Sequence, residues 1–313
     1  MPGAPLPIAS LIWACACLWP ADGLAAGPPR ARRLRQPPSG QPRPQAFLQN
    51  SSVATAPTQR AADACGLQLL TTFFTHKRDW QRDRYTQPDF GYMAAFYESA
   101  MRAGVNVTVL HDGLPEDLVA EHETPAVRFQ QVDTASYDPV YGVNDVRFLA
   151  FGDVLRSHPE WEYVFNVDVS DVRVVANFCP ELQPGRLYVG SETTDPEHPT
   201  IGSHPWMAER FRDLGAQYLQ WYHENGDRRI LNPGVMGGSR AVMAEAYARM
   251  RAVITDTHLA ARQQGREVDV DMGALNYVAR HDFPFPIETG PPLHSRWKKF
   301  EETRKDVWFI HKF

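Results

Sequence analysis

The sequence has little cysteine and no excess of positive charge. Its 313 residues include four Cys, which are too few for a small scaffold held together by disulfides. The formal net charge is −5, whereas a general nucleic-acid-binding protein usually carries a basic surface. We therefore expect no nucleic-acid partner. Hydrophobic residues make up 43% of the chain, which is enough to bury a sizeable core and argues against a wholly disordered protein.

Long apolar runs are also scarce. After residue 26 the sequence contains no stretch of 18 apolar residues, so we expect contact with a membrane only through an N-terminal anchor. The run from Leu6 to Trp19 has the length of a signal-peptide core and is shorter than the ~20 residues that span a bilayer. No Lys or Arg precedes it, and the small residues Ala25 and Ala26 follow it. We predict that residues 1–26 are a signal peptide or short anchor, and that the protein is secreted or works in the lumen of the secretory pathway (Golgi or ER). An untargeted leader is the alternative.

Residues 27–64 lack the apolar side chains that a folded core needs. They hold seven Pro, six Arg and a single acid, Asp63, a composition that stays disordered. We predict a disordered Pro/Arg-rich stem, which either docks on an anionic surface or serves as a solvated tether. Residues 65–313 hold 26 Lys and Arg against 35 Asp and Glu, a net charge of −9, so the expected globular body is acidic.

Removal of a signal peptide would leave two of the four cysteines. Cys15 and Cys17 lie in the N-terminal segment, whereas Cys65 and Cys179 lie in the expected body. An even pair in an oxidising compartment can form a disulfide. Two free buried thiols are an equal alternative, because the sequence does not tell whether the two Cα atoms come close enough to be bridged.

The body alternates apolar runs with helical patterns. The run Leu67–Phe74 is almost continuously apolar, as expected for a strand buried on both faces. Gly91–Ala103 carries apolar residues at helical spacing and ends before Gly104, which is typical of a helix C-terminus. The alternation predicts one Rossmann-like, three-layer α/β/α domain over residues 65–313 with a mostly parallel central sheet. We expect strands at 67–74, 105–110, 127–132, 163–167, 187–189 and near 235–236, and helices at 91–103, 143–156 and 241–255.

Two carboxylates follow the strand expected at 163–167. Asp168 and Asp171 come directly after this apolar run, and open α/β sheets bind ligands outside the carboxyl ends of their strands. Two neighbouring carboxylates repel each other unless they share a cation or a proton. A hard divalent cation such as Mg²⁺ or Mn²⁺ suits oxygen ligands and also binds phosphate. The pair therefore indicates either a metal site or, equally, an Asp-capped turn with a second Asp at the surface.

Three further segments carry chemistry. The segment NPGVMGGS at 232–239 has three glycines, which let a ligand approach the backbone or simply make a turn before a helix. Asp269 and Asp271 precede an expected helix, where acids either suit the helix dipole or face a hydroxyl group. His311 and Lys312 lie inside an apolar C-terminal segment, which is unusual for a frayed tail. A lone His is nevertheless more often a packed surface residue than a ligand.

In this order, these segments resemble the GT-A superfamily of nucleotide-diphospho-sugar glycosyltransferases over roughly residues 65–313. The resemblance rests on VFNVDVSDVRV, NPGVMGGS, DVDMGALNY and the late His-Lys pair. It implies a single GT-A-like domain that transfers a sugar from a nucleotide-diphosphate donor, with a UDP-sugar expected, to a hydroxyl on a glycan or glycoprotein. It also implies a divalent cation, Mn²⁺ or Mg²⁺, that bridges the donor diphosphate.

The resemblance implies a role for each candidate site residue. The implied metal ligands are Asp168, Asp171 and His311. Asp271 would be the acceptor-side acid, with Asp269 as its competitor. Thr72 and Thr75 are implied to contact the base, Arg147 the nucleotide and Lys312 the diphosphate. The sugar is implied to contact Asn232, Gly234, Gly237 and Gly238. Because His311 must be neutral to bind a metal, we expect activity to fall at mildly acid pH.

Other protein classes compete with this interpretation. A non-catalytic secreted carbohydrate- or nucleotide-sugar-binding protein with the same fold is the main alternative. A haloacid-dehalogenase-type phosphatase would need an Asp and a Thr where the chain has Ser170 and Val172. Ser170 also stands where GT-A proteins usually have the second Asp of their acidic motif. No GxGxxG segment follows the first expected strand, which disfavours a dinucleotide-dependent dehydrogenase.

Overall fold

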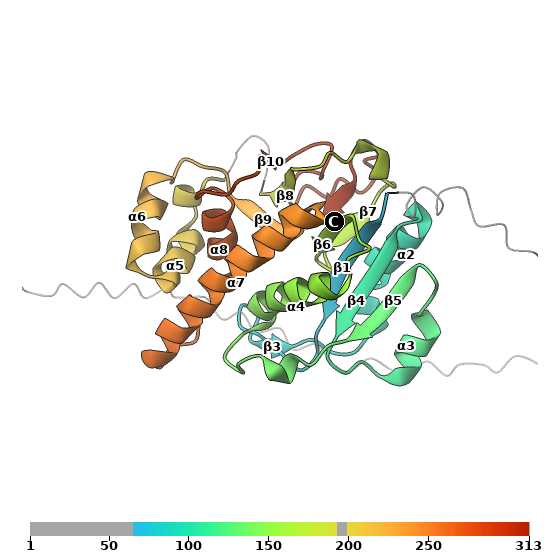
Figure 1. The fold of residues 1–313 in the computed structure, drawn as a ribbon, viewed down its shortest axis with the longest axis horizontal. Coiled ribbons are helices and arrows are strands. Elements are labelled where there is room, and N and C mark those ends of the chain that lie inside the picture. Colours follow the sequence, from blue (N-terminus) through green and yellow to red (C-terminus); the bar gives the residue numbers. More distant parts are fainter. Residues whose placement is uncertain (1–64, 193–198, 313) are drawn as a thin grey trace, which may run out of the picture. The chain divides into compact units, whose positions relative to one another are not determined.

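The computed structural model describes residues 65–192 and 199–312. The predicted signal segment at 1–26 and the predicted stem at 27–64 lie outside the described residues. The described part is an α/β domain around a seven-stranded sheet, as the alternation of strands and helices predicts (Figure 1).

The central sheet has the strand order β10–β8–β9–β6–β1–β4–β5. Strands β5, β4, β1 and β6 pair in parallel, whereas β9 runs antiparallel to both β6 and β8. The sheet is therefore mostly parallel, as predicted, with one reversed strand between β6 and β8. Its strands are β1 (Leu67–Phe73), β4 (Asn106–His111), β5 (Val127–Gln131), β6 (Tyr163–Val167), β8 (Leu187–Ser191), β9 (Leu231–Ser239) and β10 (Ile287–Glu288).

Helices cover both faces of this sheet. Successive residues of β1 point to opposite faces, so Leu70 belongs to one apolar core and Leu69 to the other. The first core lies under α4, α5, α6, α7 and α8, and Figure 1 shows α4 and α7 side by side over this face. The second core takes in α2 and a small sheet of β7 and β11. These elements are α2 (Ala94–Ala103), α4 (Val143–Ser157), α5 (Pro205–Leu214), α6 (Ala216–Glu224), α7 (Arg240–Gln263), α8 (Asp271–Val278), β7 (Val172–Val174) and β11 (Phe309–His311).

The longer elements lie where the sequence predicts them. Strand β6 occupies the predicted residues, and α2 ends at Gly104, whose φ of 65° is the left-handed conformation expected of a helix C-cap. Other elements were not predicted, because their stability comes from tertiary packing more than from local pattern. They include α5, α6, α3 (Glu116–His122), the hairpin of β2 (Arg78–Asp79) and β3 (Arg84–Tyr85), and the 3₁₀ turns η1 (Phe90–Tyr92), η2 (Thr134–Ser136), η3 (Cys179–Glu181) and η4 (Ile201–Ser203).

The structure decides between the two states of the body's cysteines. Cys65 and Cys179 form a disulfide, with their Cα atoms 6.2 Å apart. The disulfide joins the segment just before β1, which contains Cys65, to the first residue of the turn η3. The alternative of two free thiols is therefore wrong for this fold. Among the helices of the described residues, none is both long and apolar enough to cross a membrane.

Candidate active site

A cavity of about 1160 Å³ opens at the carboxyl edge of the sheet. Because β9 is reversed, its first residues meet the carboxyl ends of β6 and β8. Asp168 follows β6, Glu192 follows β8, and Asn232 lies near the start of β9, so three neighbouring strands each present a polar side chain to one cavity. Helices α4 and α8 add Arg147 and Asp271 to the wall. The arrangement agrees with the rule that open α/β sheets bind ligands at this edge.

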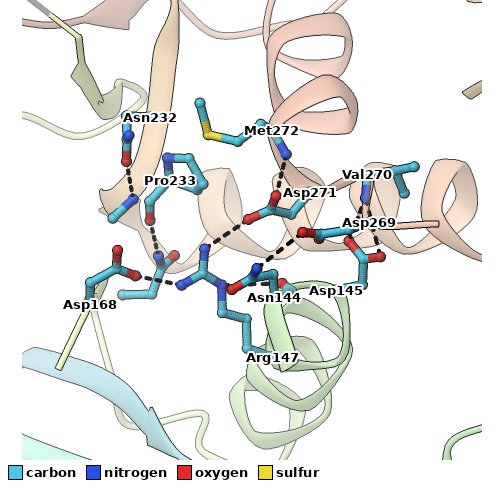
Figure 2. A network of polar contacts seen from close by, with 12 residues as sticks. Asn144, Asp145, Arg147, Asp168, Asn232, Pro233, Asp269, Val270, Asp271 and Met272 are labelled. Atoms are coloured by element: carbon cyan, nitrogen blue, oxygen red, sulfur yellow. Dashed lines mark hydrogen bonds and ion pairs between the residues drawn. The ribbon is translucent and has the colours of Figure 1, made fainter. Parts of the chain in front are cut away.

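Arg147 lies at the centre of the polar network (Figure 2). It reaches in from the second turn of α4, with Nη1 paired to Asp168 and Nη2 donating to Asp271 Oδ2 over 2.9 Å. The flat guanidinium can hold two carboxylates at once, which a Lys cannot do in the same way. Burial is the largest single influence and opposes ionisation of Asp168, but the charge and hydrogen bond of Arg147, together with the other neighbouring charges such as Lys312, outweigh it. The pKa of Asp168 therefore lies below its ordinary value. Asp168 is therefore ionised at neutral pH.

The acidic pair after β6 is split between two cations. Asp171 forms an ion pair with Lys312, and Lys312 N also donates to the backbone oxygen of Asp171 over 2.8 Å. Asp168 is held by Arg147 instead. Within the part of the chain that the structure describes, Asp168, Asp171 and His311 do not form one compact group of ligand atoms. Asp171 would have to leave Lys312 before it could join a metal held by the other two.

The imidazole of His311 is fully buried, and among residues 65–192 and 199–312 neither of its ring nitrogens has a hydrogen-bond partner. Burial lowers the pKa of His311 to about 3, so the ring is neutral and its lone pair is free at neutral pH. A Cβ added to Gly234 would overlap His311 Nε2 and would lie 2.7 Å from Asp168 Oδ2. The absence of a side chain at 234 therefore lets an imidazole nitrogen and a carboxylate oxygen share one small space.

A second acidic group lies deeper in the wall. Oxygen atoms of Asp145, Asp269 and Asp271 lie within 4.8 Å of one another, and this group could hold a metal ion. Each carboxylate also has protein partners (Figure 2). His258 Nε2 lies 2.7 Å from Asp145, Arg210 donates to Asp269 over 3.3 Å, and Arg147 holds Asp271. Burial, followed by the charge of the neighbouring acid, raises the pKa of Asp269 and of Asp271 to about 6.

Two of the predicted glycines serve the fold and do not line the cavity. A Cβ on Gly237 would overlap the ring of Phe165, and one on Gly238 would lie 2.6 Å from the backbone oxygen of Arg186. Both glycines allow β9 to pack tightly inside the sheet. Asn232 does line the cavity, and its Oδ1 accepts from Gly234 N over 2.8 Å.

The two predicted base-contacting threonines lie in different surroundings. Thr72 lines a neighbouring cavity of about 60 Å³ together with Arg147 and Asp168. Thr75 does not line it, because its N and Oγ1 donate to Asp112 Oδ1 over 2.7 and 3.2 Å. Thr75 thus ties the end of β1 to the end of β4.

Several charged residues in and beside the cavity were not predicted from the sequence. Glu192 and Arg82 line the large cavity, and Asp145 completes the acidic group. Glu192 follows a predicted strand directly, so reading every strand end for acids would have found it. Arg82 sits in the hairpin of β2 and β3, and Asp145 looks like an ordinary acid in the first turn of a helix; neither position has a local signal.

Comparison with known proteins does not identify the chain. No protein-family model matches it, and no curated protein matches it in sequence. The resemblance of its motifs to the GT-A superfamily stays a prediction.

Proposed function

We propose that the protein is a metal-dependent glycosyltransferase of GT-A type that takes a nucleotide-diphosphate sugar, with a UDP-sugar expected. The observation that carries the proposal is the convergence of Asp168, His311, Arg147 and Lys312 at the carboxyl edge of the sheet. The cavity of about 1160 Å³ beside them is large for a small-molecule site, since pockets for drug-sized ligands measure about 300–1,000 Å³. It leaves room for a donor and part of an acceptor.

Asp168 and His311 would hold the divalent cation, joined by Asp171 once that residue releases Lys312. An ionised carboxylate and a neutral, unpartnered imidazole are suitable donors, and Gly234 leaves the room between them. Carboxylate oxygens suit Mn²⁺, and Mg²⁺ is the alternative. When bound, the cation would neutralise charge on the departing diphosphate.

Basic and acidic side chains of the cavity would bind the donor and stabilise charge in the transition state. Arg147 and Lys312 line the cavity, and their positive charges would attract the donor diphosphate, with Lys312 acting as a point charge. Asp269 and Asp271 line the same cavity, where carboxylates would stabilise positive charge that develops at the anomeric carbon. The acceptor is a hydroxyl on a glycan or glycoprotein. The Cys65–Cys179 disulfide supports a secretory location, because disulfides persist in oxidising compartments.

Replacing Gly234 with Ala is expected to remove the response to metal. The new methyl group overlaps His311 Nε2 and crowds Asp168 Oδ2, so the two ligands must move apart. Overpacking of this kind costs about 1–3 kcal/mol of stability. The measurement is the rise in melting temperature on adding Mn²⁺, which we expect in the wild type and not in Gly234→Ala. Gly91→Ala is the control, because its methyl group would meet only the side chain of Asp89. An unchanged Mn²⁺ response in Gly234→Ala would contradict the assignment.

Activity is expected to fall as pH drops below about 6, for a reason other than the predicted one. With its pKa at about 3, His311 stays neutral at mildly acid pH and does not titrate there. Asp269 and Asp271, whose pKa values are raised to about 6, gain protons below that pH and lose the negative charge that the sugar requires. The ionised fraction then falls about tenfold per pH unit. The measurement is kcat/KM against pH, and a profile flat down to about pH 5 would contradict a role for these two acids.

A non-catalytic nucleotide-sugar-binding protein is the second candidate. It is favoured by one observation: Arg147 and Lys312 already neutralise Asp168 and Asp171, so the site is electrostatically satisfied without a metal. The two candidates differ in turnover. A panel of nucleotide sugars, assayed for hydrolysis and transfer in EDTA and in Mn²⁺, separates binding alone from metal-dependent chemistry.

A further inference from the structure

Glu192 has an unusual position in the wall of the large cavity. It directly follows strand β8 of the large sheet, and it is buried, with 9% of the residue exposed. Its Oε1 accepts a hydrogen bond from Asn232 Nδ2 over 3.1 Å. Asn232 cannot turn its amide around, because its Oδ1 already accepts from Gly234 N over 2.8 Å. Glu192 is therefore held in place by a neutral amide.

The other carboxylates of this cavity are all held by cations. Five acids line it, and four of them form ion pairs with Arg or Lys. Among the described residues, Glu192 alone of the five has no such pair, and its Oε2 has no hydrogen-bond partner there. A carboxylate oxygen that is bound to a guanidinium or ammonium group is occupied by that cation and is not open to a ligand hydroxyl. The four paired acids are Asp168 and Asp271 (both with Arg147), Asp171 (with Lys312) and Asp269 (with Arg210).

The surroundings of Glu192 suit a base. Burial raises its pKa, while the bond from Asn232 and the positive charge of Lys298 oppose that rise. A general base works best when its pKa approaches the working pH. Glu192 therefore combines a fixed position, an oxygen left for a ligand, and an environment that strengthens it as a proton acceptor.

Aromatic side chains lie along the same cavity. Trp206 and Trp297 both line it, and Trp206 Nε1 donates to His204 Nδ1 over 3.1 Å, which fixes the indole. Indole rings offer broad apolar faces with a polar edge, and carboxylates and amides accept and donate to hydroxyl groups. A ligand with both apolar faces and many hydroxyls, namely a sugar, fits this combination.

We propose that Glu192 is the catalytic base and that the acceptor is a sugar hydroxyl. This inference rests on the proposed glycosyltransferase function and deepens it. The acceptor oxygen forms a bond to the anomeric carbon as the bond from that carbon to the diphosphate oxygen breaks. The electron pair of the broken bond leaves with the nucleoside diphosphate, and the hydroxyl proton goes to Glu192 Oε2. Asp271, with Arg147 on one oxygen and Met272 N donating to the other over 2.6 Å, is left to stabilise charge.

The test compares Glu192→Gln with the wild type. The amide keeps the shape and can still accept from Asn232, but it cannot take a proton. We expect kcat for transfer from a UDP-sugar to a free sugar acceptor, in Mn²⁺, to fall by about 10²–10⁴-fold. Donor affinity, measured by calorimetry, and melting temperature should stay at wild-type values. Glu192→Asp should recover part of kcat, and Glu209→Gln, an exposed glutamate on α5, is the matched control.

Each outcome bears on a different claim. A large loss of kcat with intact donor binding supports Glu192 as the base. Wild-type kcat in Glu192→Gln, with loss in Asp271→Asn, overturns this inference and leaves the proposed function standing. A wild-type protein that neither binds nor turns over any nucleotide sugar overturns the proposed function, and the role of Glu192 with it.

Discussion

Replacing Arg147 with Ala is expected to destabilise the fold by about 3–5 kcal/mol and to abolish donor binding, because two carboxylates lose their cationic partner at once. The side chain of Arg147 is 13% exposed, and its partner Asp271 is 6% exposed. Without the guanidinium, Asp168 and Asp271 lie in a largely buried wall with no cation between them, and each must either stay charged there or take up a proton, both of which cost stability. Urea unfolding of the full chain measures the loss.

Two variants control this prediction. Arg147→Lys keeps the positive charge but cannot contact Asp168 and Asp271 through two separate nitrogens, so we expect an intermediate loss of stability. Arg102→Ala removes an exposed arginine paired with Glu98 on α2, and such surface pairs contribute about 0.3–0.5 kcal/mol. If Arg147→Ala cost no more than Arg102→Ala, Arg147 would not be the centre of the polar network.

Replacing Asp168 with Asn is expected to abolish turnover while the fold survives. Arg147 keeps Asp271 as a partner in this variant, and Asp168 lies at the cavity edge with 23% of its side chain exposed, so the loss of stability should be small. Turnover should fall by at least about 10²–10³-fold, the usual cost of removing one group that stabilises a transition-state charge. Steady-state kinetics with a UDP-sugar and Mn²⁺ provides the measurement.

Ser170→Ala is the informative control for Asp168→Asn. Ser170 occupies the place of the second motif acid but donates only to Asp171, over 3.3 Å. We expect near wild-type turnover from this variant. Equal losses in both variants would indicate that the loop as a whole matters, and wild-type turnover in Asp168→Asn would overturn the metal assignment.

The sequence predicted the framework of this domain because its signals are local. Apolar runs such as Leu67–Phe74 mark strands that are buried on both faces, and Gly104 marks a helix end through its backbone conformation. The place of Asp168 at a ligand-binding edge follows from the polarity change after β6. The sequence alone therefore predicts which residues form a strand and at which edge of the sheet that strand ends.

The partners of the site residues could not be predicted, because they depend on register and packing. Nothing near Arg147 in the sequence indicates that its guanidinium joins Asp168 to Asp271, which lies 124 positions away. Gly237 was assigned to the sugar site from its motif, but the reversed strand β9 turns it toward Phe165. Asp145 joins the acidic group only because α4 packs beside the start of α8.

The most direct test of the proposed function is turnover of nucleotide sugars by the full chain, first in EDTA and then after addition of Mn²⁺. The proposal predicts no hydrolysis or transfer in EDTA, recovery in Mn²⁺, and no recovery in Asp168→Asn. Turnover that is equal in EDTA and in Mn²⁺ would contradict a metal held by Asp168 and His311. Binding of a nucleotide sugar without turnover in either condition would show that the protein is a binding protein.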